Sequence, residues 1–451
     1  MPPVPLIGRL SLREYTAIVA GFTLLAFESL IRIATLAMPT PIIAWFHDYS
    51  RAVFHMVRPP SPRPPSKTLV EVEHENAKHV ERIRTATSFT ELCAIYGYEV
   101  EEHVVHTKDG YLLGLHRLPC RRGEKKALPG TPSRKPVVYL HHGLLMNSEG
   151  WVCLTTAERC IPFVLVEAGY DVWLGNNRGN KYSRKCLHAG PNTRRFWNFS
   201  IDEFCLYDIP DSVAHVLRVT RRPSLSYVGF SQGTAQAFAA LSTHPELNHL
   251  VNVFIALAPA MSPAGLATPV VDALMKASPT LMYLLFGRKS ILSSVVMWQS
   301  ILYPPIFTSI IDLAVNMLFS WESRNITAPQ KLAAYAHLFS HGSVKAVVHW
   351  FQIMRNGAFQ LYDDDVQVGH PSKRAYHPIK FPTRNIATPI VLLYGQQDSL
   401  VDIDTMLAEL PEHTIATGLP KYEHIDVLWG DNIHNDVIPH VLEALEKHSS
   451  E

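Results

Sequence analysis

The sequence feature that most constrains the fold is the pentapeptide GFSQG at 229–233, which separates two runs of different character. LSYV at 225–228 has the composition of a buried strand, and TAQAFAAL at 234–241 that of a helix. A Gly-x-Ser-x-Gly turn between a strand and a helix strains Ser231 and exposes its hydroxyl. The pentapeptide alone could be an ordinary Gly-rich turn. Its flanking elements are those that a nucleophile elbow requires.

Strand-like and helical runs alternate around this turn. Predicted strands, each followed by a loop, lie at 136–140, 171–174, 225–228, 251–257 and 389–395. Helical stretches are expected at 158–168, 202–219 and 433–447. Such alternation predicts an α/β fold with a mostly parallel sheet covered on both faces. A chain of 451 residues buries enough apolar surface for this without a disulfide or metal.

The alternation stops between residues 262 and 388, which predicts an inserted cap over the site. Residues 262–320 are apolar with few charges, and 330–360 look helical. A second membrane-spanning helix within 281–320 is the alternative. Arg288 and the Pro304-Pro305 pair count against it.

Charge and cysteine usage exclude several classes of protein. Lys and Arg total 41, and Asp and Glu total 40. The chain therefore lacks the basic excess that a nucleic-acid partner would require. The six cysteines lack CxxC spacing, which argues against a disulfide framework or a zinc site. No phosphate-binding or dinucleotide-binding glycine motif is present. We therefore expect no cofactor and no metal.

A serine nucleophile needs a base and an orienting acid, and in this fold class the chain order is serine, acid, histidine. Asp398 lies three residues after the predicted strand at 389–395; Asp402 and Asp404 are rivals farther from its end.

His424 follows a predicted strand near 414–417 and precedes the last helix, whereas His434 and His440 fall in or beside that helix. The chain has 23 histidines, so order relative to Ser231 carries this assignment.

The oxyanion of a tetrahedral intermediate needs two backbone N–H donors. We expect one from Gln232, directly after the serine, and one from Leu144 in the HHGLL turn at 141–145. The alternative for that turn is a simple exit from a strand.

The N-terminus contains an uncharged apolar run at 15–27, followed by Glu28 and Arg32. A cleaved signal peptide fits poorly. A single transmembrane helix over 15–37, or a membrane hairpin or in-plane anchor bent at Pro39 and Pro41, fits better. A hydrophobic helix packed on the globular domain is the remaining alternative. Basic residues after the run predict a cytosolic main domain.

Several sequence blocks together resemble the acid lipase family, which includes gastric and lysosomal acid lipases and the fungal steryl ester hydrolases. The resemblance spans roughly 88–445. The blocks are ELCAIYGYEVEEHVVHTKDGYLLGLHRLP (91–119), YLHHGLLMNSEGWV (139–152), DVWLGNNRGNKYSRK (171–185), FWNFSIDEFCLYDIP (196–210), YVGFSQGT (227–234), HGSVKAVVHWFQ (341–352), YGQQDSLVD (394–402) and YEHIDVLWG (422–430).

This resemblance implies an α/β-hydrolase fold with a helical cap, Ser231 as nucleophile, Asp398 as acid and His424 as base. It also implies that Leu144 and Gln232 form the oxyanion hole. Phe230 stands where many members have a histidine, and 265–335 matches loosely. The apolar N-terminus resembles the membrane-attached fungal members rather than the secreted ones.

The sequence thus predicts a membrane-attached serine hydrolase of neutral lipid esters at the endoplasmic reticulum or lipid droplet, with steryl esters as the first substrate. A triacylglycerol lipase, another esterase or acyltransferase, and a catalytically silent lipid-binding protein are the alternatives. The expected segments are a membrane anchor (1–58), a Pro-rich linker (59–87), a first part of the hydrolase core (88–261), a cap (262–388) and a second part of the core (389–451).

Overall fold

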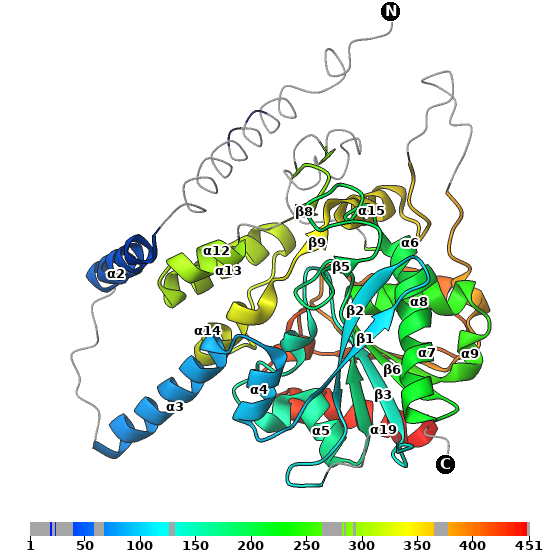
Figure 1. The fold of residues 1–451 in the computed structure, drawn as a ribbon, viewed down its shortest axis with the longest axis horizontal. Helices are drawn as coiled ribbons and strands as arrows, with labels where there is room; N and C mark the ends of the chain where they lie inside the picture. Colours follow the sequence, from blue (N-terminus) through cyan, green and yellow to red (C-terminus); the bar gives the residue numbers. More distant parts are fainter. Residues whose placement is uncertain are drawn as a thin grey trace, which may run out of the picture.

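The computed structural model describes residues 39–57, 67–125, 131–263, 282–283, 286–291, 295–364 and 378–448, together with Val19 and Thr23. Its centre is a twisted sheet with the strand order β1-β2-β4-β3-β6-β7-β10-β11, and β5 pairs with β2 (Figure 1). The strands are β1 (Glu101–His106), β2 (Tyr111–Leu118), β3 (Val137–His141), β4 (Asp171–Leu174), β5 (Lys185–Cys186), β6 (Leu225–Phe230), β7 (Val251–Leu257), β10 (Ile390–Gly395) and β11 (Ile415–Leu419).

The six strands from β4 to β11 are parallel, which confirms the predicted mostly parallel sheet. The antiparallel hairpin of β1 and β2, which pairs with β4, was not predicted from the sequence. Its turn is built by Thr107, whose backbone N–H donates to the carbonyl of Tyr111, and by Gly110 with φ +94°. Glycine adopts this left-handed conformation without strain.

Side chains alternate between the two faces of the sheet. In β3, Val138 and Leu140 belong to one buried cluster, whereas Val137 and Tyr139 belong to the other. The first cluster includes residues of α5 (Ile161–Glu167) and α19 (Ile438–His448), and the second includes residues of α7 (Ile209–Thr220) and α8 (Gln232–Thr243). Helices therefore cover both faces, as Figure 1 shows.

The predicted helical stretches are present but divided. The 202–219 stretch forms α6 (Ile201–Glu203), the single π-turn η3 (Phe204–Asp208) and α7. The 433–447 stretch is divided at Val437 into α18 (Ile433–Asp436) and α19. The remaining short elements of the core are α4 (Phe89–Ile95), η1 (Ser148–Trp151), η2 (Ala157–Arg159), α9 (Leu247–Leu250), η4 (Thr383–Asn385), α16 (Ile403–Glu409) and α17 (Asp426–Trp429).

Between β7 and β10 the chain leaves the sheet and builds mainly helical structure. The described elements are β8 (Ser290–Ile291), α12 (Val295–Ile301), α13 (Pro304–Phe319), α14 (Ala328–Leu338), β9 (Gly342–Ser343) and α15 (Val344–Asn356). Loops that follow the carboxyl ends of β3 and β10 contact this insertion. Ser340 N–H donates to Leu145 O, and Ser399 Oγ donates to Phe319 O. The insertion therefore covers the end of the sheet at which Ser231 lies.

Two N-terminal helices contact the insertion. α3 (Lys67–Thr85) packs against α14, and α2 (Thr40–Val57) packs against α12 (Figure 1). The Tyr303 N–H donates to Ser50 Oγ of α2 at 3.1 Å. No helix in the described part of the chain is long and apolar enough to cross a membrane. The transmembrane helix predicted over 15–37 lies outside the described residues, apart from Val19 and Thr23.

Candidate active site

Ser231 lies between the end of β6 and the start of α8, with φ 52° and ψ −121°. Positive φ is rare for a residue with a side chain and marks a strained backbone. The flanking glycines permit this turn. A Cβ on Gly229 would lie 2.9 Å from the backbone of Gly233, and a Cβ on Gly233 would lie 2.4 Å from His141 O. The elbow therefore packs directly against the end of β3.

The structure brings Ser231, His424 and Asp398 into one chain of hydrogen bonds. His424 Nε2 lies 2.7 Å from Ser231 Oγ, and His424 Nδ1 lies 2.6 Å from Asp398 Oδ2. The Asp398 side chain is fully buried, and His424 is 4% exposed. The second carboxylate oxygen of Asp398 accepts the Leu400 N–H at 2.9 Å. This geometry allows His424 to take the Ser231 proton while Asp398 orients the imidazole.

The loops that carry the acid and the histidine are packed tightly together. A Cβ on Gly395, the last residue of β10, would lie 2.2 Å from Tyr422 O. The Gln397 N–H donates to the same carbonyl oxygen at 3.0 Å. These contacts fix the separation of Asp398 and His424, although the two residues are 26 positions apart in sequence.

The alternative candidates for the acid and the base lie away from Ser231. Asp402 caps the N-terminus of α16, where its carboxylate accepts the Thr405 N–H at 3.1 Å. Asp404 is exposed on the same helix. His434 is exposed in α18, and its Nε2 lies 3.0 Å from Asn435 Nδ2. His440 lies in α19. None of these four side chains takes part in the Ser231 hydrogen-bond chain.

Leu144 and Gln232 line the same hollow beside the elbow. A Cβ on Gly143 would lie 3.1 Å from Ser231 Cβ, so the turn after β3 lies close to the serine. Gln232 is the first residue of α8, and an N–H at that position has no acceptor within the helix. The Gln232 side chain makes a separate contact: its Oε1 accepts a hydrogen bond from Trp350 Nε1 of α15 at 2.8 Å. Donation by the Leu144 and Gln232 backbones to an oxyanion stays a prediction.

Two buried histidines support the turn after β3. Burial lowers the pKa of His141 to about 4 and that of His142 to about 3, so both are neutral at physiological pH. His142 Nδ1 lies 2.8 Å from Gly143 O, and its Nε2 accepts the Asn177 N–H at 3.1 Å. His141 Nε2 lies 2.8 Å from Asn177 Oδ1. The sequence alone indicated no role for either imidazole.

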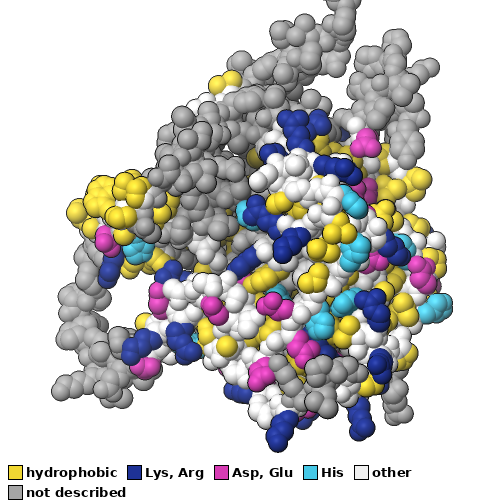
Figure 2. Space-filling view, in the orientation of Figure 1, with side chains coloured by type: hydrophobic (Ala, Val, Ile, Leu, Met, Phe, Trp, Pro, Cys, Tyr) yellow, Lys and Arg dark blue, Asp and Glu magenta, His cyan; other side chains and the backbone are white. Residues whose placement is uncertain are grey.

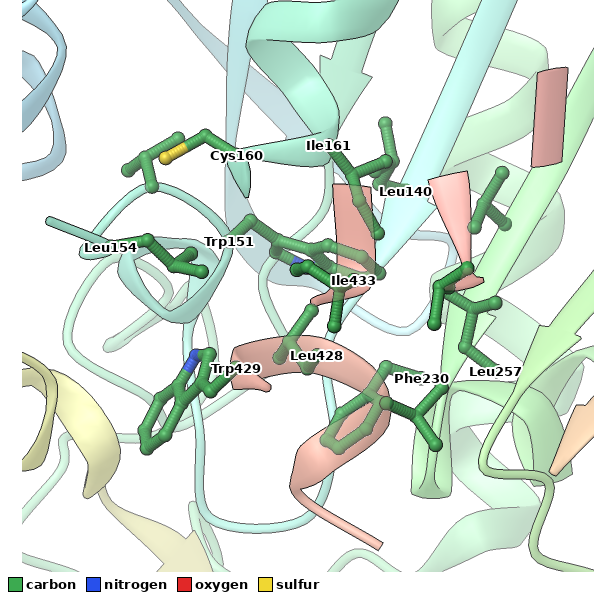
Figure 3. Packing of buried hydrophobic residues seen from close by; sticks show 14 of the residues in the cluster. Leu140, Trp151, Leu154, Cys160, Ile161, Phe230, Leu257, Leu428, Trp429 and Ile433 are labelled. Atoms are coloured by element: carbon green, nitrogen blue, oxygen red, sulfur yellow. The ribbon is translucent and has the colours of Figure 1, made fainter. Parts of the chain in front are cut away.

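The surroundings of His424 are aromatic. The centroid of the Phe230 ring lies 5.4 Å from that of the imidazole. Figure 3 shows Phe230 among Leu257, Leu428 and other buried apolar residues, so its ring is part of the core. The Trp321 ring stacks on His424 with 5.1 Å between centroids. No motif in the sequence singled out Trp321.

Among the described residues, no group of three or more His, Cys, Asp or Glu side chains could hold a metal ion. The hydrogen-bond chain from Ser231 through His424 to Asp398 can support proton transfer and nucleophilic attack by the serine hydroxyl. In this chain a strained serine is hydrogen-bonded to a buried His–Asp pair at the carboxyl end of a mostly parallel sheet. This combination is that of the α/β-hydrolases.

Comparison with known proteins supports the assignment to the α/β-hydrolases. A family model for the α/β-hydrolase fold matches residues 136–436, and a partial α/β-hydrolase lipase region matches 89–155. A probable lipase of Schizosaccharomyces pombe is 44% identical over 97% of this chain and 94% of its own. Rat lysosomal acid lipase/cholesteryl ester hydrolase is 34% identical over 77% and 89%, and human gastric triacylglycerol lipase is 30% identical over 79% and 91%.

The chain belongs to the acid lipase family. Its activity is accordingly that of a lipase, a carboxylic ester hydrolase acting on lipid esters.

Proposed function

We propose that this lipase cleaves neutral lipid esters by a serine mechanism, with Ser231 as nucleophile, His424 as general base and Asp398 as orienting acid. The observation that carries the proposal is the unbroken hydrogen-bond chain from Ser231 Oγ through His424 to the buried Asp398. Asp398 keeps Nδ1 protonated, which leaves Nε2 free to accept the serine proton.

The reaction proceeds in two stages. Ser231 Oγ attacks the ester carbonyl as His424 takes its proton, and the Leu144 and Gln232 N–H groups donate to the oxyanion. His424 then delivers the proton to the leaving alcohol. Water, activated by the same imidazole, hydrolyses the acyl-enzyme and releases the fatty acid.

Steryl ester is the first expected substrate and triacylglycerol the second. The hollow beside the elbow is lined in part by the apolar side chains of Leu144, Leu145, Met146, Phe199 and Phe204, together with polar side chains such as those of Asn177 and Gln232. We expect these apolar side chains to contact the acyl chain or the apolar alcohol of the ester. The names of the rat and human relatives match these two substrate classes.

Phospholipids are expected to be poor substrates. Among the described residues that line the hollow, Arg178 is the one Lys or Arg, and its guanidinium is bound to the carboxylates of Asp208 at 2.6 Å and Asp109. Its positive charge is therefore neutralised within the protein. The described lining therefore offers a phosphate group no unpaired Lys or Arg.

We also propose that the N-terminal region attaches the enzyme to a membrane or lipid-droplet surface, with the catalytic domain in the cytosol. Figure 2 shows hydrophobic side chains gathered over α2. Trp45, Tyr49 and Met56 of α2 are 58%, 58% and 81% exposed. Helix α13 adds exposed apolar residues, including Leu313 and Met317. Amphipathic helices with aromatic residues suit the interface of a lipid phase such as that of the endoplasmic reticulum or lipid droplet.

The test of substrate class compares cholesteryl oleate, triolein and phosphatidylcholine at equal surface fraction in detergent micelles, with Ser231→Ala as the inactive control. We expect cholesteryl oleate to be cleaved fastest and phosphatidylcholine slowest. Faster cleavage of triolein would retain the mechanism and overturn the sterol preference. Fastest cleavage of phosphatidylcholine would overturn the neutral-lipid proposal.

A further inference from the structure

The segment 319–323, between α13 and α14, approaches the proposed catalytic histidine from the insertion. The indole of Trp321 is 4% exposed and lies parallel to the imidazole of His424, with an interplanar angle of 6°. Phe319 stacks on the same indole at 4.2 Å and 17°. The imidazole is thus flanked by a stacked aromatic pair that belongs to the cap.

The same segment is bound to both catalytic loops. The Glu322 and Ser323 N–H groups donate to the Glu423 carboxylate, at 2.8 and 2.7 Å, next to His424. Ser399, which follows Asp398, donates from its hydroxyl to Phe319 O at 2.8 Å. These three bonds bind the backbone on both sides of Trp321 to the loops of the acid and the base.

The backbone around Trp321 is strained. Ser320 and Ser323 both have positive φ, 60° and 49°, without being glycine. Such conformations are destabilising and persist only where surrounding contacts determine them, and they concentrate at functional sites. The strain and the three hydrogen bonds together give Trp321 one fixed position.

The Trp321 N–H is buried, and no residue that the structure describes accepts a hydrogen bond from it. The indole is therefore held by its two faces and by the backbone, and not by its nitrogen. A phenylalanine at this position would keep an aromatic face without breaking a hydrogen bond.

We propose that Trp321 is a positioning residue for the base: its indole face fixes the plane of the His424 imidazole and stabilises the imidazolium that forms in the reaction. The electron-rich face of an indole attracts a cation, most strongly where water is excluded. His424 becomes cationic only after it takes the serine proton. The stack therefore favours the transition state more than the ground state, and its loss lowers kcat rather than raising KM. The inference rests on the proposed function.

The test compares Trp321→Phe with Trp321→Leu on a short soluble ester, because both replacements are apolar and only one is aromatic. We expect the phenylalanine variant to keep kcat within about threefold of the wild type. The leucine variant should lose about tenfold in kcat, equivalent to about 1.4 kcal/mol, with KM within about twofold.

Trp173 offers a matched control. It is fully buried, its N–H likewise finds no acceptor in the described part of the chain, and it lies in the cluster on the other face of the sheet. Trp173→Phe and Trp173→Leu show how far a loss of stability alone lowers kcat. Thermal unfolding is measured for these two variants and for the two Trp321 variants. We expect the Trp173 pair to lose stability without a selective loss of kcat.

Equal kcat values for the two Trp321 variants, or a loss confined to KM, would overturn the proposal. If Trp321→Leu does not fold, Glu423→Gln carries the test, because it weakens the acceptor of two of the three bonds. A fall of at least about threefold in kcat supports the proposal, and an unchanged kcat overturns it. Absence of any Ser231-dependent hydrolysis in the wild type would instead overturn the proposed function.

Discussion

Replacing Gly233 with alanine tests the packing of the elbow most sharply. The added methyl carbon would lie 2.4 Å from His141 O and 2.8 Å from His142 O. An ordinary C···O contact is about 3.3 Å or longer, so β3 and α8 must separate by about 0.9 Å. Both neighbours are backbone atoms, which cannot rotate away as a side chain can. We expect a loss of about 1–3 kcal/mol in the free energy of unfolding.

The same displacement separates Gln232, on α8, from the turn that carries Leu144. A misplacement of about 1 Å at a reacting centre costs on the order of a hundredfold in rate. The assay measures kcat on a soluble ester together with thermal unfolding. Gly190→Ala is the control, because Gly190 has no atom within 4 Å of its Cβ position. Equal kcat for the two variants would refute the packing argument.

Three further predictions concern the acid, the cap and the N-terminus. Asp398→Asn should lower kcat by orders of magnitude, whereas Asp402→Asn should leave it near normal; the reverse result would move the acid to Asp402. Glu149 is buried and lies 3.0 Å from His337 of α14, so Glu149→Gln should cost about 3 kcal/mol of stability at pH 7. Burial opposes ionisation of Glu149, but its hydrogen bonds outweigh burial and lower its pKa. The ionised form of Glu149 therefore stabilises the fold above pH 4.5. When unfolding is measured at falling pH, the free energies of unfolding of the wild type and of Glu149→Gln should converge below that value. A chain beginning at Lys67 should leave the membrane fraction yet cleave a short soluble ester; retention after an alkaline carbonate wash would place the attachment surface in the cap.

The sheet and the serine–histidine–acid arrangement could be predicted because both depend on local sequence signals. Strands such as 171–174 and 251–257 match the structure at both ends, since short, mainly apolar runs rich in β-branched and aromatic residues mark buried strands. Position relative to the predicted strands and the last helix distinguished Asp398 and His424 from the other candidates, because the fold fixes which strand ends meet Ser231.

The parts that could not be predicted depend on contacts between distant segments. Trp321 reaches His424 from 103 residues away in sequence, and no spacing rule marks it. The hairpin of β1 and β2 has one half-exposed strand, so its apolar pattern is weak. The π-turn η3 interrupts a helix whose periodicity looks continuous. Tertiary packing, rather than local preference, determines all three features.

The central claim is that Ser231 is activated by His424 and attacks the ester. The most direct measurement is reaction of the purified protein with a fluorophosphonate, followed by mass spectrometry of its peptides. The account predicts one covalent adduct, at Ser231. It also predicts rapid labelling of the wild type and His434→Ala, and labelling slowed by orders of magnitude in His424→Ala. An adduct at another residue, or normal labelling of His424→Ala, would contradict the account.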